Sequence, residues 1–419
     1  MKIFIVNKSD SRGGAARAAY RTHLCLRSNG IDSKMIVDNK ETGDWTVIGP
    51  NGNIDKFIRY IKPQLIKPIN FLFKRNNDIV QSFNLFPSKW LKFINNSEVD
   101  IVNLHWINGE MLSIEQISKI KKPIVWTLHD MWAICGSEHY TTTKRWERGY
   151  IRNNRPFNET GIDIDKWCWR RKVRNWGKTL TIVCPSNDLA KCVKKSFLFR
   201  DNPVHVIPNP IDTEKWRPIE KSNAKELLKI SQETKLILFG AIGGTKDPRK
   251  GFDLLIKSLK ILKETRSLSN IKLLIFGQLQ PKEQIDFGFP TIYAGHLHDD
   301  LSLDILYSAS ELMVVPSRQE ILPLTAQEAI ACGTPVVGFN IGGLEDIVVN
   351  KSNGYLAEPF NTKDLANGIE WIINNNKKGE ISSSARSFAI KKFSIKNISK
   401  KYLRIFEEIH KKNYKYQKY

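Results

Sequence analysis

The sequence lacks the features that would place it in several large classes of protein. No apolar run in its 419 residues approaches the about 18 residues of a membrane-spanning helix. The first apolar stretch, IFIV, is too short for a secretory signal peptide. The six cysteines are scattered and form no C-x-x-C pair, which argues against a disulfide framework and against a zinc ribbon. We therefore expect a protein of the reduced cytoplasm with no membrane-spanning segment.

Acidic residues are outnumbered by basic ones, and unevenly so along the chain. The 65 Lys and Arg against 43 Asp and Glu give a formal net charge of +22. Residues 1–208 carry +15, residues 209–389 carry −1 and residues 390–419 carry +8. We expect the two basic parts to meet an anionic partner, namely a membrane, a nucleic acid or a phosphorylated substrate.

Short apolar segments rich in β-branched residues alternate with helical patterns along the chain. The expected strands are Lys2–Asn7, Lys34–Asp38, Asp100–His105, Ile124–Leu128, Leu180–Cys184, Val204–Ile207, Lys235–Phe239, Ile271–Phe276, Thr291–Ala294, Leu312–Val315 and Pro335–Phe339. The expected helices are Ala15–Asn29, Phe252–Thr265, Ser302–Ala309, Leu324–Cys332, Leu344–Val349 and Thr362–Asn374, and helical spacing returns from Phe393 onward. This order predicts an α/β protein with two Rossmann-like, doubly wound parallel-sheet domains.

The segment Pro208–Asn209–Pro210 separates the two sets of strands. Two prolines around an asparagine continue neither a strand nor a helix, so we place the domain boundary there. The N-terminal domain then covers residues 1–208 and the C-terminal domain residues 209–389.

The region 136–177 departs from the alternation of strands and helices. We expect an irregular insertion over Glu138–Asp165 and a basic helix over Lys166–Trp176. Cys135 and Cys168 are too few for a zinc site, so we expect a metal-free insertion.

Residues 320–328 read EILPLTAQE and enter a helix whose first turn holds Pro323. Proline fits that turn, and the free backbone N–H groups there can bind phosphate oxygens. These N–H groups would belong to Leu322, Leu324 and Thr325. Glu320 could accept hydrogen bonds from sugar hydroxyls, and Glu328 could accept a pair from a ribose. On their spacing alone, the two glutamates are a weak signal, and two solvated charges are the more common explanation of such a pair.

The segment VVPSRQEILPLTAQEAIACGTPVVGFNIGGLEDIV, residues 314–348, resembles the retaining nucleotide-sugar glycosyltransferases of GT-B fold, family 4 of the group 1 type. The resemblance extends to the Gly13–Gly14 loop, TLHDMW at 127–132, CPS at 184–186, VIPNPID at 206–212 and RKGFDLL at 249–255. It implies that the neutral C-terminal domain binds the donor and the basic N-terminal domain binds the acceptor. It also implies that residues 390–419 cross back to the first domain and that the metal-free insertion faces the acceptor.

The resemblance assigns roles to three side chains on the donor side. Glu328 would hold the nucleotide ribose, Glu320 would contact the donor sugar, and Lys250 would neutralise the diphosphate. Family members often carry an arginine six residues before this lysine, where this chain has Gly244. Arg249 or Lys246 would take over that role.

Two positions of the N-terminal domain are candidates as well, and the resemblance places the first, Gly14, at the diphosphate of the donor or at the acceptor. Gly14 lies in a glycine loop before a helix, where backbone can approach an anion closely, although a tight turn alone would also need glycine. The loop lacks the G-x-G-x-x-G spacing of a dinucleotide site. His129 follows an expected strand, at the sheet edge where open α/β sheets bind ligands, and the resemblance places it at the transferred sugar or the acceptor. His105 ends a neighbouring strand, and we interpret it as structural, packed beside Trp106.

The resemblance implies transfer of a sugar from a nucleotide-diphosphate sugar to a hydroxyl of a glycan or lipid-linked acceptor, with retention and with neither cofactor nor metal. His129, Lys250 and Glu320 would be the catalytic groups, and the setting would be polysaccharide synthesis at the cell surface. The alternatives are a GT-B-fold epimerase or phosphorylase and, from a different class, a nucleic-acid-binding protein. No nucleic-acid-binding module is recognisable, so we expect no nucleic-acid partner.

The segment Asp55–Arg75 combines basic and apolar residues. Together with the basic tail it could hold the enzyme on the inner face of the plasma membrane, where a lipid-linked acceptor is located. Pro63 and Pro68 are expected to break any long helix here. A core-packed element with a solvated basic face is the alternative.

Overall fold

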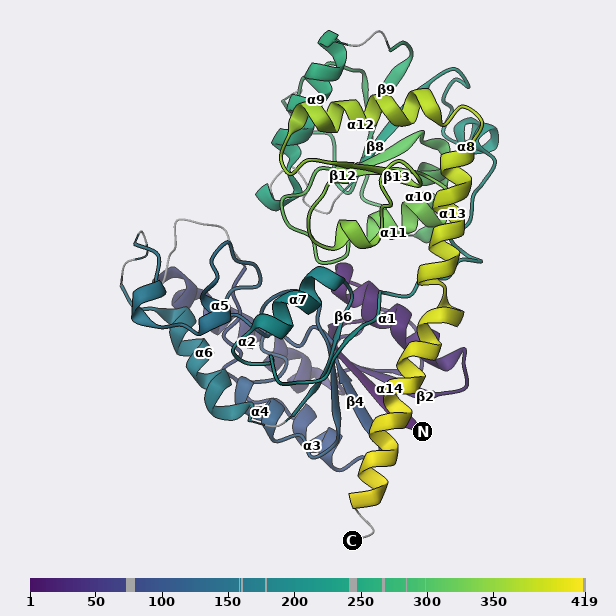
Figure 1. Cartoon of the computed structure of the whole chain (residues 1–419). Coiled ribbons are helices and arrows are strands. Elements are labelled where there is room, and N and C mark those ends of the chain that lie inside the picture. Colours follow the sequence, from purple (N-terminus) through teal and green to yellow (C-terminus); the bar gives the residue numbers. More distant parts are fainter. Residues whose placement is uncertain are drawn as a thin grey trace. The chain divides into compact units, whose positions relative to one another are not determined.

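The computed structural model of the chain consists of two compact units (Figure 1). Unit 1 comprises Met1–Ile207 and Ser399–Tyr419, and unit 2 comprises Pro208–Ile398. The structure describes residues 1–72, 80–157, 159, 161–177, 179–240, 247–265, 268–283, 285–297 and 299–416. Among these residues, no helix is both long enough and apolar enough to span a membrane.

Unit 1 is built on a seven-stranded parallel sheet in the order β3-β2-β1-β4-β5-β6-β7. The strands are β1 Lys2–Ser9, β2 Asp32–Asn39, β3 Val47–Ile48, β4 Ile101–Leu104, β5 Ile124–Thr127, β6 Thr181–Cys184 and β7 Val204–Val206. The helices are α1 Gly14–Arg27, α2 Asn53–Leu72, α3 Trp90–Asn95, α4 Ile114–Ser118, α5 Arg145–Arg148, α6 Ile164–Asn175, α7 Asn187–Lys195 and the 3-10 helix η1 Arg152–Asn154.

Unit 2 repeats the architecture with a six-stranded parallel sheet in the order β10-β9-β8-β11-β12-β13. The strands are β8 Lys235–Gly240, β9 Ile271–Phe276, β10 Thr291–Gly295, β11 Leu312–Val315, β12 Val336–Phe339 and β13 Gly354–Ala357. The helices are α8 Lys221–Leu227, α9 Phe252–Thr265, α10 Asp300–Ala309, α11 Leu324–Ala331, α12 Thr362–Asn375, α13 Glu380–Phe393 and the 3-10 helices η2 Pro248–Lys250 and η3 Gly342–Asp346.

Helices cover both faces of the sheet in unit 2 (Figure 1). One buried apolar cluster joins the sheet to α9 and α12, and includes Leu259 and Ile369. A second cluster joins it to α10, α11 and α13, and includes Leu306 and Ala329. Burial on both faces explains why these strands are continuous apolar runs without alternation. The expected doubly wound α/β class is confirmed.

All the expected strands are present, with ends displaced by at most two residues. Two short strands, β3 and β13, were not expected, because two residues are too few to show a pattern and β13 begins with a glycine. The expected helix at Leu344–Val349 is wrong. The chain there forms the 3-10 helix η3, since Leu344 N–H bonds the carbonyl of Ile341 and Gly343 N–H bonds that of Glu320.

The expectation that prolines break the segment after Asp55 is also wrong. Helix α2 runs through both Pro63 and Pro68. Each proline removes one backbone hydrogen bond, and tertiary packing offsets that loss. Ile66 of α2 belongs to a buried cluster with Phe83 and with Ile164 of α6.

Helix α14, Ile395–Tyr416, begins in unit 2 and belongs to unit 1 from Ser399 onward. Its Tyr402 hydroxyl lies 3.2 Å from Thr127 Oγ1 at the end of β5. The expected C-terminal helix that crosses back to the first domain is therefore present. We expected the crossing to begin at residue 390, whereas residues 390–398 belong to unit 2, because Ala389 and Phe393 of α13 are buried in its core.

The region 136–177 is irregular apart from α5, η1 and α6, as expected over its first part. One lysine side chain of its basic helix, α6, points into the core. Lys172 is fully buried, and its Nζ donates to the carbonyls of Cys135 at 3.0 Å and Gly136 at 2.7 Å, above the ring of Trp132 at 3.8 Å. Burial lowers the pKa of Lys172 to about 8. This lysine therefore stabilises the insertion and adds no charge to its surface.

Candidate active site

The segment between β11 and α11 carries the glutamate motif of unit 2. Pro323 is the N-cap residue of α11, one position before the first helical turn where we expected it. No side chain caps this helix, and its first turn contains no acidic residue. The backbone N–H groups of Leu324 and Thr325 therefore lie in the uncapped first turn, where N–H groups bind anions. Leu322, just before the helix, is buried.

Glu320 and Lys250 form an ion pair although 70 residues separate them. Lys250 Nζ lies 2.6 Å from Glu320 Oε1, which also accepts the Ser317 hydroxyl at 2.8 Å. The side chains are 26% and 11% exposed, respectively, so both can be reached from solvent. The fold thus brings together two of the three expected catalytic groups.

The 3-10 helix η2, which carries Lys250, is tied to the loop after β11. Arg318 N–H donates to the carbonyl of Arg249 at 2.6 Å, and the Arg318 guanidinium binds Asp253 at 2.7 and 2.8 Å. Gly251 has a φ of +64°, and a Cβ there would lie 1.8 Å from the carbonyl oxygen of Pro316. The lysine–glycine pair therefore requires glycine for this close approach.

Arg249 itself is paired within its own turn. Its Nε and one terminal nitrogen donate to the two oxygens of Asp247 at 3.1 and 2.6 Å. Lys246, the other candidate partner of Lys250, and Gly244 lie outside the described residues. Whether Arg249 or Lys246 assists Lys250 stays a prediction.

Glu328 is buried in α11, with 1% of its surface exposed. Its Oε2 accepts the hydroxyl of Tyr307, a fully buried residue of α10, at 3.0 Å. Sequence reasoning did not select Tyr307, because an aromatic residue on the apolar face of a helix normally indicates only core packing. A buried carboxylate on the next helix that needs a donor could have indicated it.

Two glycines pack closely against the loop that carries Glu320. A Cβ at Gly342 would lie 2.3 Å from the carbonyl oxygen of Glu320, and one at Gly343 would lie 1.8 Å from that of Ile321. The glycine pair of the motif therefore serves to bring η3 against the Glu320 loop.

Gly14 begins α1 of unit 1 and is exposed. The N-cap residue Gly13 has a φ of +86°, no side chain caps the helix, and its first turn contains no acidic residue. The loop before it is ordered by Ser9, whose hydroxyl accepts the N–H groups of Ser11 at 3.2 Å and Arg12 at 3.1 Å. The geometry supports both an anion site and a simple turn.

His129 follows β5, and its Nε2 lies 2.8 Å from Nδ1 of His105, which follows β4. Burial lowers the pKa of His129 to about 4, and burial with the nearby His129 lowers that of His105 well below its ordinary value. Both rings are therefore neutral at neutral pH. We interpreted His105 as packed beside Trp106, but its imidazole is bonded to His129.

Asp130 organises the polar groups next to His129. Its carboxylate accepts Trp106 Nε1 at 2.7 Å and Trp132 N–H at 2.9 Å, and His139 Nδ1 lies 2.5 Å from it. Although burial alone would raise it, these contacts hold the pKa of Asp130 below its ordinary value. His139 reaches on to the Ser82 hydroxyl at 2.8 Å.

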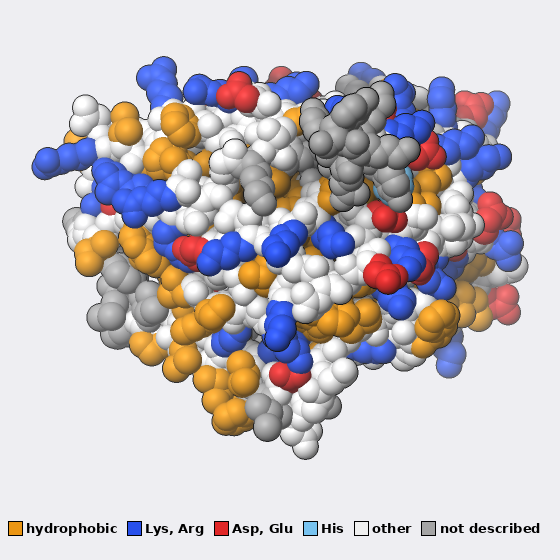
Figure 2. Space-filling model, turned by 90° about the horizontal axis from the view of Figure 1, so that it is seen from below, with side chains coloured by type: hydrophobic (Ala, Val, Ile, Leu, Met, Phe, Trp, Pro, Cys, Tyr) orange, Lys and Arg blue, Asp and Glu red, His pale blue; other side chains and the backbone are white. Residues whose placement is uncertain are grey.

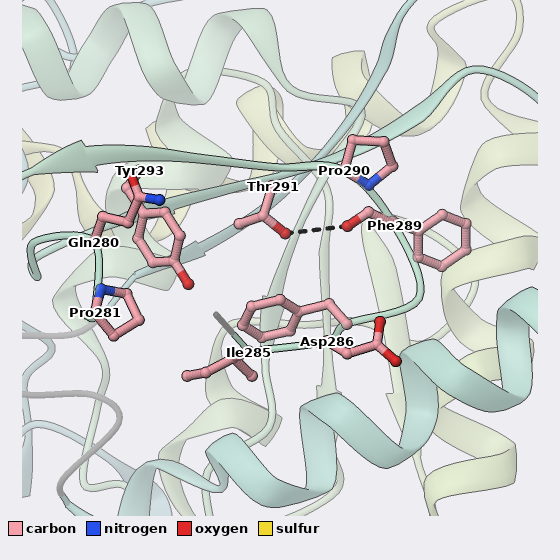
Figure 3. Close-up of a pocket in the computed structure, with 9 residues that line it drawn as sticks. Gln280, Pro281, Ile285, Asp286, Phe289, Pro290, Thr291 and Tyr293 are labelled. Carbon is pink, nitrogen blue, oxygen red and sulfur yellow. Dashed lines mark hydrogen bonds between the residues drawn. The ribbon is translucent and has the colours of Figure 1, made fainter. Parts of the chain in front are cut away.

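A pocket of about 400 Å³ lies elsewhere in unit 2, beside β10 (Figure 3). It is lined by Gln280, Pro281, Ile285, Asp286, Phe287, Phe289, Pro290, Thr291 and Tyr293. The Thr291 hydroxyl, which could contact a ligand there, instead donates to the carbonyl of Phe289 at 3.2 Å. None of the residues expected to bind the donor lines this pocket.

Comparison with protein families gives matches in both units. Residues 12–215 match the family described as Glycosyltransferase Family 4, and residues 221–388 match Glycosyl transferases group 1. Lipopolysaccharide 1,2-N-acetylglucosaminetransferase of Salmonella typhimurium is 27% identical over 241 residues, 52% of this chain and 62% of that enzyme. D-inositol 3-phosphate glycosyltransferase of Rhodococcus jostii is 28% identical over 184 residues, 41% of this chain and 40% of that enzyme. The chain thus spans less than two thirds of the length of these relatives.

Solved structures show the same fold over almost the whole chain. Sucrose-phosphate synthase of Thermosynechococcus elongatus has a TM-score of 0.67 at 14% identity, covering 98% of this chain and 99% of that one. HepE of Anabaena in complex with UDP-glucose has a TM-score of 0.64 at 16% identity, covering 97% and 100%. The pneumococcal O-GlcNAc transferase GtfA, in complex with UDP and GlcNAc, has a TM-score of 0.62 at 14% identity, covering 98% and 99%.

Enzymes of family 4 are retaining transferases. The motif residues, the two parallel sheets and the family matches in both units lead to one assignment. The chain belongs to glycosyltransferase family 4, the group 1 glycosyltransferases of GT-B fold.

Proposed function

We propose that the protein transfers a sugar from a nucleotide-diphosphate sugar to a hydroxyl of a glycan or lipid-linked acceptor, with retention at the anomeric carbon. This proposal depends on one observation: Lys250 and Glu320 form an ion pair beside the uncapped N-terminus of α11. A cation, a carboxylate and free N–H groups in one place match the diphosphate and the sugar hydroxyls of such a donor.

Lys250 would release its bond to Glu320 in order to bind the diphosphate. Its Nζ and the N–H groups of Leu324 and Thr325 would stabilise the charge that develops on the leaving group. Glu320, still bonded to Ser317, would then be free to accept hydrogen bonds from the sugar. Gly14 would add backbone contacts to the diphosphate or the acceptor.

Glu328 would accept hydrogen bonds from the two hydroxyls of the ribose. Its bond to Tyr307 supports this role, because this bond helps to hold the buried carboxylate in one orientation. We propose Tyr307 as the residue that positions Glu328.

The reaction breaks the bond between the anomeric carbon and the diphosphate oxygen and forms one between that carbon and the acceptor oxygen on the same face. The proton of the acceptor hydroxyl passes to the leaving phosphate oxygen. His129, neutral at neutral pH, would contact the transferred sugar or the acceptor near this centre. No cofactor and no metal takes part in the proposed step.

We propose a UDP-hexose as the donor. HepE binds UDP-glucose, GtfA binds UDP and GlcNAc, and the Salmonella relative is an N-acetylglucosaminetransferase, which together support this class. That relative also supports an acceptor in cell-surface polysaccharide synthesis.

Helix α2 supports a membrane-bound acceptor through its exposed apolar residues, whereas two of its basic residues, Arg59 and Lys62, make contacts within unit 1. The end of the expected segment, residues 73–75, lies outside the described residues. Arg59 is turned inward, with 9% of its side chain exposed, to Asp38 and the ring of Trp90, and Lys62 donates to the carbonyl of Pro87. Among the side chains of this helix that the structure describes, the large apolar ones that are exposed belong to Phe57, Ile58, Tyr60 and Leu65. We propose that these residues insert into the surface of an anionic membrane, on its cytoplasmic side.

Basic residues elsewhere would add attraction to anionic lipid. Figure 2 shows one face of the molecule on which Lys and Arg side chains are spread among hydrophobic ones, with fewer Asp and Glu. Each Lys or Arg near such a membrane contributes about 1 kcal/mol.

The test is a screen of UDP-sugars with lipid-linked and free glycan acceptors, with released UDP and the product measured together. We expect UDP release that depends on the acceptor, and a product whose anomeric configuration, read by NMR, matches the donor. Lys250→Met should reduce turnover strongly. A new nucleotide sugar formed without acceptor would instead identify an epimerase, and binding of nucleic acid without sugar turnover would refute the proposal altogether.

A further inference from the structure

The two histidines after β4 and β5 form a pair whose protons the proposed reaction leaves unassigned. His105 Nδ1 and His129 Nε2 are 2.8 Å apart, with ring centroids 5.1 Å apart. Pairing of the two parallel strands brings them together. The backbone of His105 is held on both sides, since its N–H donates to Val6 at 2.8 Å and its carbonyl accepts Trp126 Nε1 at 3.2 Å.

One proton lies in the hydrogen bond between the two neutral rings, and the environment of His105 decides which of the two nitrogens carries it. If His129 Nε2 donated, His105 would carry its own proton on Nε2. That atom is buried and has no hydrogen-bond partner among the described residues, so the N–H group would be orphaned. Orphaned buried N–H groups are rare, whereas an unpaired lone pair is tolerated more often. The proton therefore lies on His105 Nδ1.

We propose that His105 is a positioning residue that holds His129 in the tautomer with its proton on Nδ1. The proposal rests on the proposed function, because it assigns the form in which His129 meets the substrate. The lone pair of His129 Nε2 is occupied by His105, so it cannot take the proton of the acceptor hydroxyl. The ring then acts on a substrate oxygen as a neutral N–H donor through Nδ1.

The neighbouring carboxylate does not provide this orientation. Asp130 binds Trp106, Trp132 and His139, and within the described part of the chain no carboxylate bonds either ring nitrogen of His129. In a serine-protease triad, a carboxylate fixes the tautomer of the catalytic histidine and stabilises its charged form. Here a neutral imidazole fixes the tautomer, which suits a histidine that stays neutral throughout the reaction.

The tautomer is measurable without any assay of activity. Ring-¹⁵N-labelled histidine and long-range ¹H–¹⁵N correlation spectra of the full chain separate the two neutral tautomers, and His129→Asn assigns the signals. We expect the wild-type His129 ring to carry its proton on Nδ1. His105→Leu should shift it towards the Nε2 tautomer and lower kcat about 10- to 100-fold, with the donor KM little changed.

A conservative variant and a matched control separate positioning from stability. His105→Asn keeps an N–H donor near the Nδ1 position and should restore the wild-type tautomer and most of kcat. His23 is equally buried in the same unit, between Ser33 at 2.8 Å and Thr46 at 2.7 Å, and His23→Asn should leave the signals of His129 unchanged.

Two results would overturn the proposal: a wild-type His129 ring with its proton on Nε2, or a folded His105→Leu variant with tautomer and kcat unchanged. If His105→Leu does not fold, the wild-type and His105→Asn spectra still decide. A chain with the expected tautomer that transfers no sugar would refute the proposed function and leave the tautomer assignment standing.

Discussion

Replacing Tyr307 by phenylalanine removes one hydroxyl and tests how Glu328, the proposed ribose ligand, is held. The ring stays in place, packed against Trp216 and Phe276 with both centroids 6.0 Å away, so the variant changes no apolar contact. The lost bond is that of the Tyr307 hydroxyl to Glu328 Oε2, 3.0 Å long, between residues that are 0% and 1% exposed.

The magnitude follows from the burial of this bond. A hydrogen bond to a charged group contributes about 1.5–3 kcal/mol, and the carboxylate would keep its desolvation cost without the donor. Tyr307→Phe should therefore lower the free energy of unfolding by about 2 kcal/mol, which corresponds to a Tm lower by about 4–8 °C for a unit of this size. If Glu328 binds the ribose, the donor KM should also rise about tenfold.

Tyr355→Phe is the matched control in the same unit. The Tyr355 hydroxyl donates to Asp364 at 2.9 Å, but both residues are part-exposed, so its loss should cost less than about 1 kcal/mol. Its donor KM should equal that of the wild type. Thermal unfolding measures the Tm of both variants, and initial-rate kinetics measures their donor KM. An unchanged KM in Tyr307→Phe, together with the expected drop in Tm, would refute the proposal that Tyr307 positions Glu328 for the ribose.

Three further predictions test the loop, the buried histidine and the exposed helix. Gly251→Ala places a Cβ 1.8 Å from the carbonyl oxygen of Pro316 at a φ of +64°, so it should lower stability by at least about 1–2 kcal/mol and weaken donor binding. Calorimetric titration with UDP measures the affinity, and a wild-type affinity would contradict the role of the lysine–glycine turn. Burial lowers the pKa of His23 to about 4, against about 6.5 in the unfolded chain, so the unfolded state binds the extra proton first. As the pH falls from 6.5 to 4, His23 alone should therefore lower stability by roughly 3 kcal/mol. In urea titrations, His23→Asn should flatten that part of the profile of stability against pH, and an unaltered slope would contradict the low pKa of His23 in the folded protein. Phe57→Ser with Tyr60→Ser should reduce sedimentation with anionic vesicles severalfold, whereas equal binding of the wild type to neutral and anionic vesicles would rule out the charge contribution.

The alternation of strands and helices could be predicted because it depends on neighbouring residues. The expected strand over Ile271–Phe276 and the expected helix over Phe252–Thr265 agree with β9 and α9 to the residue. Propensity failed where distant contacts decide the outcome. Prolines interrupt a helix locally, yet α2 continues through Pro63 and Pro68 because its inner face is packed.

Charged residues in both units illustrate the same limit. Lys250 and Glu320 could be selected from motif and resemblance, but their ion pair joins positions on η2 and after β11 that only the sheet of unit 2 brings together. Arg59 and Lys172 were counted as surface charge, whereas the fold turns both into the protein. Composition counts charges and cannot say which of them face solvent.

The sequence by itself determined the class of fold through its apolar runs and the family through the resemblance of its motifs, because both depend on residues that are neighbours in the chain. Only the tertiary structure decided which partner each buried polar residue has: Tyr307 for Glu328, His105 for His129 and Asp38 for Arg59. These pairings depend on strands and helices that are far apart in the chain and adjacent in the sheet, where a buried polar group must find a partner. Such partners set the orientation and the proton positions on which the proposed chemistry depends.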